Sequence, residues 1–380
     1  HYRHWPRVPI IQFRPDESEA RPLAAAARGA ATPDATPHAA DTAPDHPRRL
    51  PVSVVVPARD EAENLKRLLP ALICLDPPPA EVLVVDDRST DGTGAVAAGF
   101  GMRVLGTTEP PAGWSGKNWA CRLGAEATTG AWLLFTDADT WHAPASLGAA
   151  LAVARRDDAD LLSLFPAQEC RSIWERLVLP FAFGQFFAAI GPHWANDDRA
   201  PSAIANGQYL LIGRDLYERI GGHGAVRASL GEDVELARLA RRAGGRVRVY
   251  RGEHLVRVRM YRTLGGIQTG FRKYMTGYLT AYPPHGALIG LATAVAGLPL
   301  IRLVQAALGR GSWRLAGASC AVGVLGFLPW VRWFGIRPLW ALLQPLAYAV
   351  FQVVALDAGL RSVLGVRVTW KGRRYRLTGP

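Results

Sequence analysis

Two aspartates separated by a single residue, Asp137 and Asp139, follow the apolar run at residues 132–135. That run has the composition of a buried strand, and alternate residues of an extended chain point to the same side, so we expect both carboxylates to face one cavity. Hard carboxylate oxygens suit Mg²⁺ or Mn²⁺. A helix N-cap or a solvated turn would explain the same pair without a metal. We favour a divalent-cation site because a second acidic cluster occurs at an equivalent position.

This second cluster, Asp86 and Asp87, follows another apolar run at residues 82–85. Carboxylates that converge on one crevice repel each other unless a cation or hydrogen-bond donors compensate, which indicates a metal ion bridged by a diphosphate. We expect the second cluster to bind the nucleoside of such a ligand. The alternative is an Asx turn around Asp91, which suits that residue better than it suits Asp86 and Asp87 together.

A third acidic pair, Glu232 and Asp233, opens a segment with a strongly helical pattern at residues 234–242. Acidic residues in a first helical turn are stabilised by the helix dipole, so capping alone would account for them. The more specific hypothesis is general-base catalysis, in which a carboxylate takes the proton from a hydroxyl group as it attacks. We expect Asp233 to be that base.

Three cationic residues are candidates for binding an anion. Lys117 begins a predicted helix after a glycine-containing turn, where backbone amides and the ammonium group would together meet a phosphate. Its alternative is a solvated surface lysine. Arg272 and Lys273 precede the apolar C-terminal part of the chain, and they would neutralise a leaving diphosphate or contact lipid phosphates.

The elements that would position these residues alternate between strands and helices. Residues 52–57 have the pattern of a buried parallel strand, leucines at helical spacing follow between residues 65 and 72, and further strands are predicted at 82–85 and 132–135. This order predicts right-handed crossovers and a doubly wound, Rossmann-like α/β sheet. Ligands bind such sheets beyond the carboxyl ends of the strands. The residues that follow the first strand are Pro57, Ala58, Arg59, Asp60 and Glu61.

Three parts of the chain differ in composition. Residues 1–50 are basic and then rich in Ala and Pro, with too few large apolar residues to fold, and the start at His1 suggests an upstream membrane helix or signal anchor. Residues 51–281 carry the sheet pattern. Residues 282–380 contain apolar stretches near 286–308, 315–331 and 338–360, of which the first and third reach the length of about 20 residues that crosses a bilayer.

Two earlier segments, residues 173–190 and 264–278, mix apolar and basic residues at helical spacing. They would lie on a bilayer surface or cover the sheet as ordinary amphipathic helices. Three crossings would put the basic tail opposite the catalytic domain, against the positive-inside tendency, so we expect one stretch, 315–331, to be re-entrant or interfacial.

The net charge of +12 does not indicate nucleic-acid binding, because the basic residues are spread along the chain and no zinc-finger or aromatic RNA-binding motif is present. Positive charge beside apolar spans is better explained by the inner face of an anionic membrane. The four cysteines lie far apart and form no CxxC pair, so neither a disulfide framework nor a zinc site is predicted.

Taken together, the motifs resemble the ordered motif set of family 2 glycosyltransferases with a GT-A fold. The matching segments are residues 52–61, 84–93, 137–139 and 231–233. The resemblance covers about residues 51–282 and implies inversion at the anomeric carbon, with Asp139 as the main metal ligand, Asp137 beside it and Asp233 as the base. The residues expected to bind the nucleotide sugar are Pro57, Ala58, Arg59, Glu61, Asp86, Asp87, Lys117, Asp137, Arg272 and Lys273.

A narrower likeness concerns residues 114–117, 259–262 and 368–375, which are similar to motifs of bacterial carotenoid-acid (diaponeurosporenoate-type) glucosyltransferases and hopanoid-associated glycosyltransferases. It implies a UDP-sugar donor, a lipid or carotenoid acceptor dissolved in the membrane, and a cell-membrane protein whose catalytic domain faces the cytoplasm. A carotenoid carboxylate would already be ionised near neutral pH, and Asp233 would then orient the acceptor without deprotonating it.

Three alternatives were weighed against this function. Processive polysaccharide synthases carry Gln-x-x-Arg-Trp, whereas here Gln268 is followed by Arg272 one place late, which disfavours polymerisation. A nucleotidyltransferase would need a glycine-rich phosphate loop after the first strand. A non-catalytic membrane protein that binds sugar nucleotides would be expected to lack acidic residues that are all present here.

Overall fold

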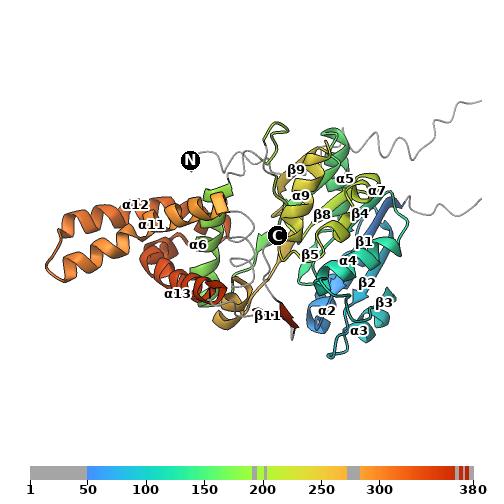
Figure 1. The fold of residues 1–380 in the computed structure, drawn as a ribbon, viewed down its shortest axis with the longest axis horizontal. Coiled ribbons are helices and arrows are strands. Elements are labelled where there is room, and N and C mark those ends of the chain that lie inside the picture. The colour runs from blue at the N-terminus through green and yellow to red at the C-terminus, as the bar shows by residue number, and fades with distance from the viewer. Residues whose placement is uncertain are drawn as a thin grey trace, which may run out of the picture.

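The computed structural model describes residues 49–190, 195–200, 203–271, 283–363, 368–370 and 373–375. The predicted N-terminal tether, Arg272 and Lys273 lie outside these described residues. Figure 1 shows two parts along the longest axis, a sheet flanked by helices and a bundle of long helices.

Seven strands form the central sheet, and all neighbours in it are parallel except that β8 runs antiparallel to both β4 and β6. In spatial order the strands are β3 (Arg103–Gly106), β2 (Pro79–Asp86), β1 (Leu50–Ala58), β4 (Trp132–Phe135), β8 (Leu210–Gly213), β6 (Leu161–Phe165) and β9 (Val247–Arg251). The predicted doubly wound mixed sheet is confirmed. Because β8 begins where β4 ends, with Leu210 opposite Phe135, residues that precede β8 lie at the same edge as residues that follow β4.

Helices cover both faces of the sheet, because its central strands are apolar on both sides. One core contains leucines of α2 and α5, and the other contains small and apolar side chains of α4, α7 and α9. The helices of the first face are α2 (Ala62–Ile73), α3 (Thr93–Gly99) and α5 (Ser146–Arg156). Those of the second are α4 (Gly116–Glu126), α7 (Arg214–Arg219) and α9 (Glu232–Arg242), with the short α8 (Gly222–Ala225) beside α4.

A small second sheet connects the end of β4 to the later part of the domain. It contains β5 (Thr140–His142), β10 (Val256–Val258) and β7 (Ala167–Gln168), with β10 in the middle. The antiparallel pairing of β10 with β5 brings Arg259 to the turn before β5, where its backbone N–H donates to the carbonyl oxygen of Asp139 over 3.3 Å.

The second part consists of α6 and the C-terminal helices. α6 (Ile173–Ile190) packs against α11 (Pro283–Ala307), α12 (Trp313–Trp333) and α13 (Gln344–Val363), and the 3₁₀ helix η3 (Pro338–Leu343) precedes α13. Among the residues that the structure describes, three segments are long and apolar enough to cross a membrane, at 290–307, 313–333 and 338–357. The predicted apolar stretches are thus confirmed, and the middle one is longer than expected.

Two segments were expected to be helices on a bilayer surface or over the sheet. The first, α6, packs against α11, α12 and α13, and its aromatic residues share an apolar core with α12, α13 and Phe165 at the end of β6. Of the segment 264–278, residues 264–271 are helical and the rest lies outside the described residues. The chain ends in a two-stranded hairpin, β11 (Val368–Trp370) and β12 (Arg373–Tyr375).

Candidate active site

A cavity of about 300 Å³ lies at the edge of the sheet where β1, β2 and β4 end. It collects residues from stretches that are far apart in sequence. The residues predicted from sequence that line it are Pro57, Ala58, Arg59, Glu61, Asp87, Lys117, Asp137, Asp139 and Glu232. A smaller cavity next to it shares Pro57, Lys117, Asp137 and Glu232, and is also lined by Asp233.

Lys117 joins two of the acidic clusters. Its Nζ lies 2.7 Å from Oδ1 of Asp137 and 2.8 Å from Oε1 of Glu232. The side chain of Glu232 is only 8% exposed, and that of Lys117 is 29% exposed, so solvent screens these ion pairs weakly. Lys117 is therefore not the solvated surface lysine that sequence alone would allow.

The start of α4 fixes Lys117 in this position. Ser115 caps the helix by accepting the backbone N–H of Asn118, and its own N–H donates to the carbonyl oxygen of Arg227. The buried Asn118 amide donates to the carbonyl oxygens of Val226, Arg227 and Ser229. These bonds attach the beginning of α4 to the loop that leads into α9, and so they set the position of Lys117 relative to Glu232.

Asp137 and Asp139 reach the cavity by a different route from the one expected. Both lie in the turn between β4 and β5 and not within a strand, so strand alternation is not the reason that they share a cavity. The turn is held by Thr140, whose hydroxyl donates to the carbonyl oxygen of Asp137 over 2.8 Å, and by the backbone N–H of Arg259 on the carbonyl oxygen of Asp139.

These two carboxylates fit a divalent cation that receives further ligands from a bound molecule. Among the described residues no group of three or more His, Cys, Asp or Glu side chains is placed to hold a metal ion. Two hard oxygen donors on one turn would leave most coordination positions of Mg²⁺ or Mn²⁺ to phosphate oxygens and water, which is how Mg²⁺ is commonly bound.

The loops after β1 and β2 are linked to each other. The backbone N–H of Asp60 donates to Ser89, and the carboxylate of Asp60 accepts the N–H of Thr90 over 2.8 Å. Arg59 donates to the carbonyl oxygen of Asp87 over 2.8 Å. The two segments expected to bind a nucleoside thus form one wall of the cavity.

Asp86 does not line this cavity. Its Oδ1 accepts the backbone N–H of Ser89 over 3.0 Å, so the residue stabilises the turn after β2. Asp87 is buried, lines the cavity and accepts the hydroxyl of Thr107. Asp91 makes the expected Asx turn with Thr93 and also accepts the N–H of Ala62 at the start of α2.

Asp233 lies beside the larger cavity and not in its lining. Its Oδ2 accepts the backbone N–H of Gly207 over 2.8 Å, and its Oδ1 accepts that of Val234 over 2.9 Å. Burial and the neighbouring carboxylate of Glu232 raise the pKa of Asp233 to about 6. His223 also lines the smaller cavity, but burial lowers the pKa of its imidazole to about 3, so it is uncharged near neutral pH.

Comparison with known proteins identifies the domain. Residues 53–183 match the family model described as Glycosyl transferase family 2. This segment is a family 2 glycosyltransferase domain. A mannosyltransferase from Pyrobaculum calidifontis, PcManGT, solved in complex with GDP-Man and Mn²⁺, superposes with a TM-score of 0.50 and 21% identity over 82% of this chain and 90% of that one. That likeness shows that the fold of the glycosyltransferase domain is GT-A.

Curated relatives carry one activity name. The 4,4'-diaponeurosporenoate glycosyltransferase of Staphylococcus haemolyticus (strain JCSC1435) is 26% identical over 339 residues, which are 86% of this chain and 88% of that protein. The enzyme of the same name from Staphylococcus aureus (strain MRSA252) is 26% identical over 231 residues, and the chain spans 60% of its length. The chain is an enzyme of the nucleotide-sugar-dependent glycosyltransferase class.

Some residues that line the cavity of the glycosyltransferase domain were not singled out from sequence. They are Asp60, Asn64, Ser115, Ala120, Ala138, Gln208, Ser229, Leu230, Met260 and Tyr261. Tyr261 is buried, and its burial together with the nearby carboxylates of Asp139 and Asp137 raises the pKa of its phenol. The signal that would have found Met260 and Tyr261 is the motif at residues 259–262, which sequence reasoning used only for the acceptor.

Removal of the lysine charge should destabilise the glycosyltransferase domain. Lys117→Met leaves Asp137 and Glu232 without their shared cation, and we expect a loss of roughly 1–3 kcal/mol in unfolding free energy, below the value for a fully buried pair because Lys117 is partly exposed. Chemical denaturation in detergent measures the loss.

The matched control for this prediction is Lys66→Met. Lys66 pairs with Glu63 on the exposed face of α2, with side chains 53% and 75% exposed, and such pairs contribute about 0–1 kcal/mol. Equal losses in the two variants would contradict the bridging role.

Proposed function

We propose that this enzyme transfers a sugar, glucose, from a UDP-sugar to a lipid or carotenoid acceptor dissolved in the membrane, with inversion at the anomeric carbon. The observation that carries the proposal is that one cavity collects the residues after β1 and β2, the two aspartates of the β4–β5 turn and Glu232. Tyr261, which also lines it, contacts Phe271, and Phe271 contacts Phe351 of α13. The diaponeurosporenoate glycosyltransferases of staphylococci support this acceptor class by their name.

The donor is assigned to the walls of the cavity. Pro57, Ala58, Arg59, Glu61 and Asp87 would hold the nucleoside at the ends of β1 and β2. Lys117 and Asp137 would lie by the diphosphate. Arg272 and Lys273 are proposed for the same diphosphate on the sequence pattern alone, and Asp86 is proposed to support the turn that carries Asp87.

Asp139 and Asp137 would hold Mg²⁺ or Mn²⁺. When bound, the cation would neutralise the diphosphate leaving group as a Lewis acid. The chain's own contribution is to keep two acidic side chains on one short turn, with Lys117 compensating part of their charge. The Mn²⁺ in the structure of PcManGT supports a divalent metal of this kind.

Asp233 would take the proton from a hydroxyl acceptor. A base with a pKa near 6 is ionised at neutral pH and remains basic enough to accept a proton. Each carboxylate oxygen of Asp233 accepts one backbone N–H, which leaves lone pairs for a further partner. With a carboxylate acceptor, Asp233 would orient the acceptor without deprotonating it.

The acceptor would come from the bilayer. The ring of Tyr261 lies 6.0 Å from that of Phe271, and Phe271 lies 6.2 Å from Phe351 of α13, so apolar contacts lead from the cavity into the helices. We propose residues 51–281 as the catalytic domain on the cytoplasmic face of the cell membrane, 282–380 as the membrane region, and 1–50 as a flexible segment.

Mass spectrometry of lipid extracts tests the function. Cells that express the wild type should accumulate a glycosylated lipid or carotenoid that is absent with Asp139→Ala, because loss of the main metal ligand should abolish transfer. The control Asp198→Ala removes an exposed acidic residue that pairs with Arg248 and does not line the cavity, and it should preserve the product. Full transfer by purified Asp139→Ala in the presence of a chelator would refute the metal role.

The pH dependence of transfer depends on the acceptor. With a hydroxyl acceptor, kcat/KM should rise as the pH increases through about 6, because the raised pKa keeps Asp233 protonated below that value and only its carboxylate accepts a proton. Asp233→Asn should then reduce the rate roughly 10²- to 10⁴-fold. With a carotenoid carboxylate as the acceptor, kcat/KM should not rise through this pH range, and Asp233→Asn should not cause the large loss of rate. A large loss with the carboxylate acceptor at an unchanged fold would contradict the orienting role.

A further inference from the structure

A buried amide faces the cavity without an assigned role. Gln208 is only 5% exposed, and it lines the cavity. It lies just before β8, at the edge where β4 ends. Its carbonyl oxygen accepts the hydroxyl of Thr136 over 2.8 Å, and the N–H of the preceding residue, Gly207, donates to Asp233. Gln208 is therefore held between the aspartate turn and the acidic pair of α9.

The direction of this amide follows from the backbone. The N–H of Gln208 donates to Oδ1 of Asn206 over 3.0 Å, so the other atom of the Asn206 amide, Nδ2, is the donor that lies 3.1 Å from Oε1 of Gln208. Nε2 of Gln168 donates to the same oxygen over 3.3 Å. Because Oε1 receives two donors, Nε2 of Gln208 is the atom turned the other way. Gln208 is one of the residues that line the cavity.

We propose that Nε2 of Gln208 donates a hydrogen bond to a hydroxyl oxygen of the transferred sugar and makes the enzyme selective for donors that carry that hydroxyl. The proposal rests on the proposed function. Asp137, Asp139 and Glu232 line the same cavity and are carboxylates that accept from hydroxyl groups, and Lys117 is a cation paired with two of them. The amide of Gln208 would add a neutral donor to the recognition of a polyol. A sugar that lacks the matching hydroxyl would leave a buried N–H group unpaired, which is a strong source of discrimination.

The test compares UDP-glucose with its four monodeoxy analogues, which lack the hydroxyl at carbon 2, 3, 4 or 6. For the wild type, kcat/KM should fall at least about tenfold more with one analogue than with each of the other three. Gln208→Leu should lower kcat/KM for UDP-glucose by a similar factor and treat that analogue and UDP-glucose alike. Gln208→Glu keeps the acceptor for Asn206 and Gln168 but replaces the donor, and it should show the same loss of discrimination with an intact fold.

Binding of UDP alone should be unchanged in both variants. If all four analogues keep their wild-type penalties in Gln208→Leu and Gln208→Glu, or if every donor is weakened equally, the sugar contact is refuted. If the wild type transfers no sugar from UDP-glucose or another nucleotide sugar, the proposed function itself fails, which is a separate result.

An independent observation concerns the third apolar segment, η3 with α13. Gln344, the first residue of α13, is buried, and its Nε2 donates to the carbonyl oxygen of Ala296 over 2.9 Å. A Cβ atom on Gly323 would lie 2.9 Å from Oε1 of Gln344. Ala296 is near the middle of α11 and Gly323 is at the middle of α12. The start of α13 therefore lies halfway along the hairpin of α11 and α12.

The chain contacts the glycosyltransferase domain both before and after Gln344. Before it, the indole N–H of Trp333 at the end of α12 donates to Glu253, which follows β9. After it, Phe351 contacts Phe271, seven residues or about 10 Å of helix beyond Gln344. The segment thus starts beside the domain, reaches half the depth of the hairpin and returns.

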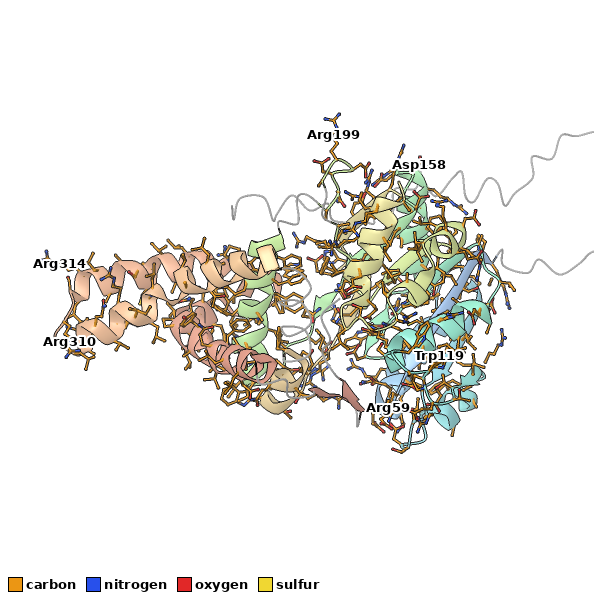
Figure 2. All side chains as sticks on the ribbon, in the orientation of Figure 1. Arg59, Trp119, Asp158, Arg199, Arg310 and Arg314 are labelled. Carbon is orange, nitrogen blue, oxygen red and sulfur yellow. The ribbon has the colours of Figure 1, made fainter. Side chains whose placement is uncertain are left out.

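We infer that α11 and α12 cross the bilayer and that η3 and α13 form a re-entrant hairpin on the side of the glycosyltransferase domain. The 21 residues of α12 span about 30 Å, the thickness of the hydrocarbon layer, and Trp and Arg occur at both of its ends. Figure 2 shows Arg310 and Arg314 at the tip farthest from the domain. The change from the 3₁₀ helix η3 to α13 is tolerable at mid-depth because Gln344 is buried and donates to the backbone of α11.

This arrangement, which rests on the proposed membrane location, differs from the expectation that residues 315–331 would be the re-entrant stretch. It puts the basic tail on the same side as the glycosyltransferase domain, in agreement with the positive-inside tendency. In Figure 1, β11 lies at the end of the helices nearest the glycosyltransferase domain.

Cysteine labelling of the full-length protein with a membrane-impermeant polyethylene glycol maleimide tests the topology in oriented vesicles. Cys74 is exposed on the glycosyltransferase domain and serves as the reference for its side. In a background where Cys74 is replaced by Ser, Thr369→Cys should be labelled from the side that labels Cys74, and Arg310→Cys from the other. Labelling of Thr369→Cys together with Arg310→Cys would indicate three crossings, and labelling of all three positions from one side would indicate none. Either result overturns the inference, while sugar transfer in the same vesicles tests the function separately.

Discussion

The ion pairs of Lys117 with Asp137 and Glu232 are the interaction on which the rest of the site depends. Carboxylates from the β4–β5 turn and from α9 meet at one sheet edge, and without compensation their repulsion would oppose the folded state. The ammonium group of Lys117, fixed at the start of α4, compensates these carboxylates, so they can lie close together before a substrate binds. A bound cation would then add to a site that is already assembled.

The same edge is connected mechanically to the membrane helices. Arg259 donates its backbone N–H to the carbonyl oxygen of Asp139, and its guanidinium group forms two hydrogen bonds with the fully buried Glu175 in the first turn of α6. α6 packs in turn against α11, α12 and α13. A single residue thus joins the β4–β5 turn to the apolar helices by short contacts.

Sequence reasoning was successful where burial and chain direction leave a simple pattern. The parallel strands β1, β2 and β4 are continuous apolar runs, and the rule that ligands bind at their carboxyl ends led to Arg59, Asp87 and Asp139. It was less successful for neighbouring acidic residues, since Asp86 and Asp87 have the same composition cues but only one of two consecutive side chains faces the cavity. Which of two consecutive side chains faces the cavity at the end of a strand depends on local contacts, such as the hydrogen bond that the N–H of Ser89 donates to Asp86.

Gln208 and the re-entrant segment were missed for a common reason, which is that both depend on a reversal of chain direction that composition does not reveal. β8 is only four residues long, and nothing in its apolar sequence distinguishes an antiparallel strand from a parallel one. Residues 338–357 have the length and hydropathy of a crossing helix, yet they begin with a 3₁₀ helix, Pro338–Leu343, and the next residue, Gln344, donates to the carbonyl oxygen of Ala296 in α11. In each case a buried glutamine lies at the reversal and is held there by hydrogen bonds to a neighbouring element.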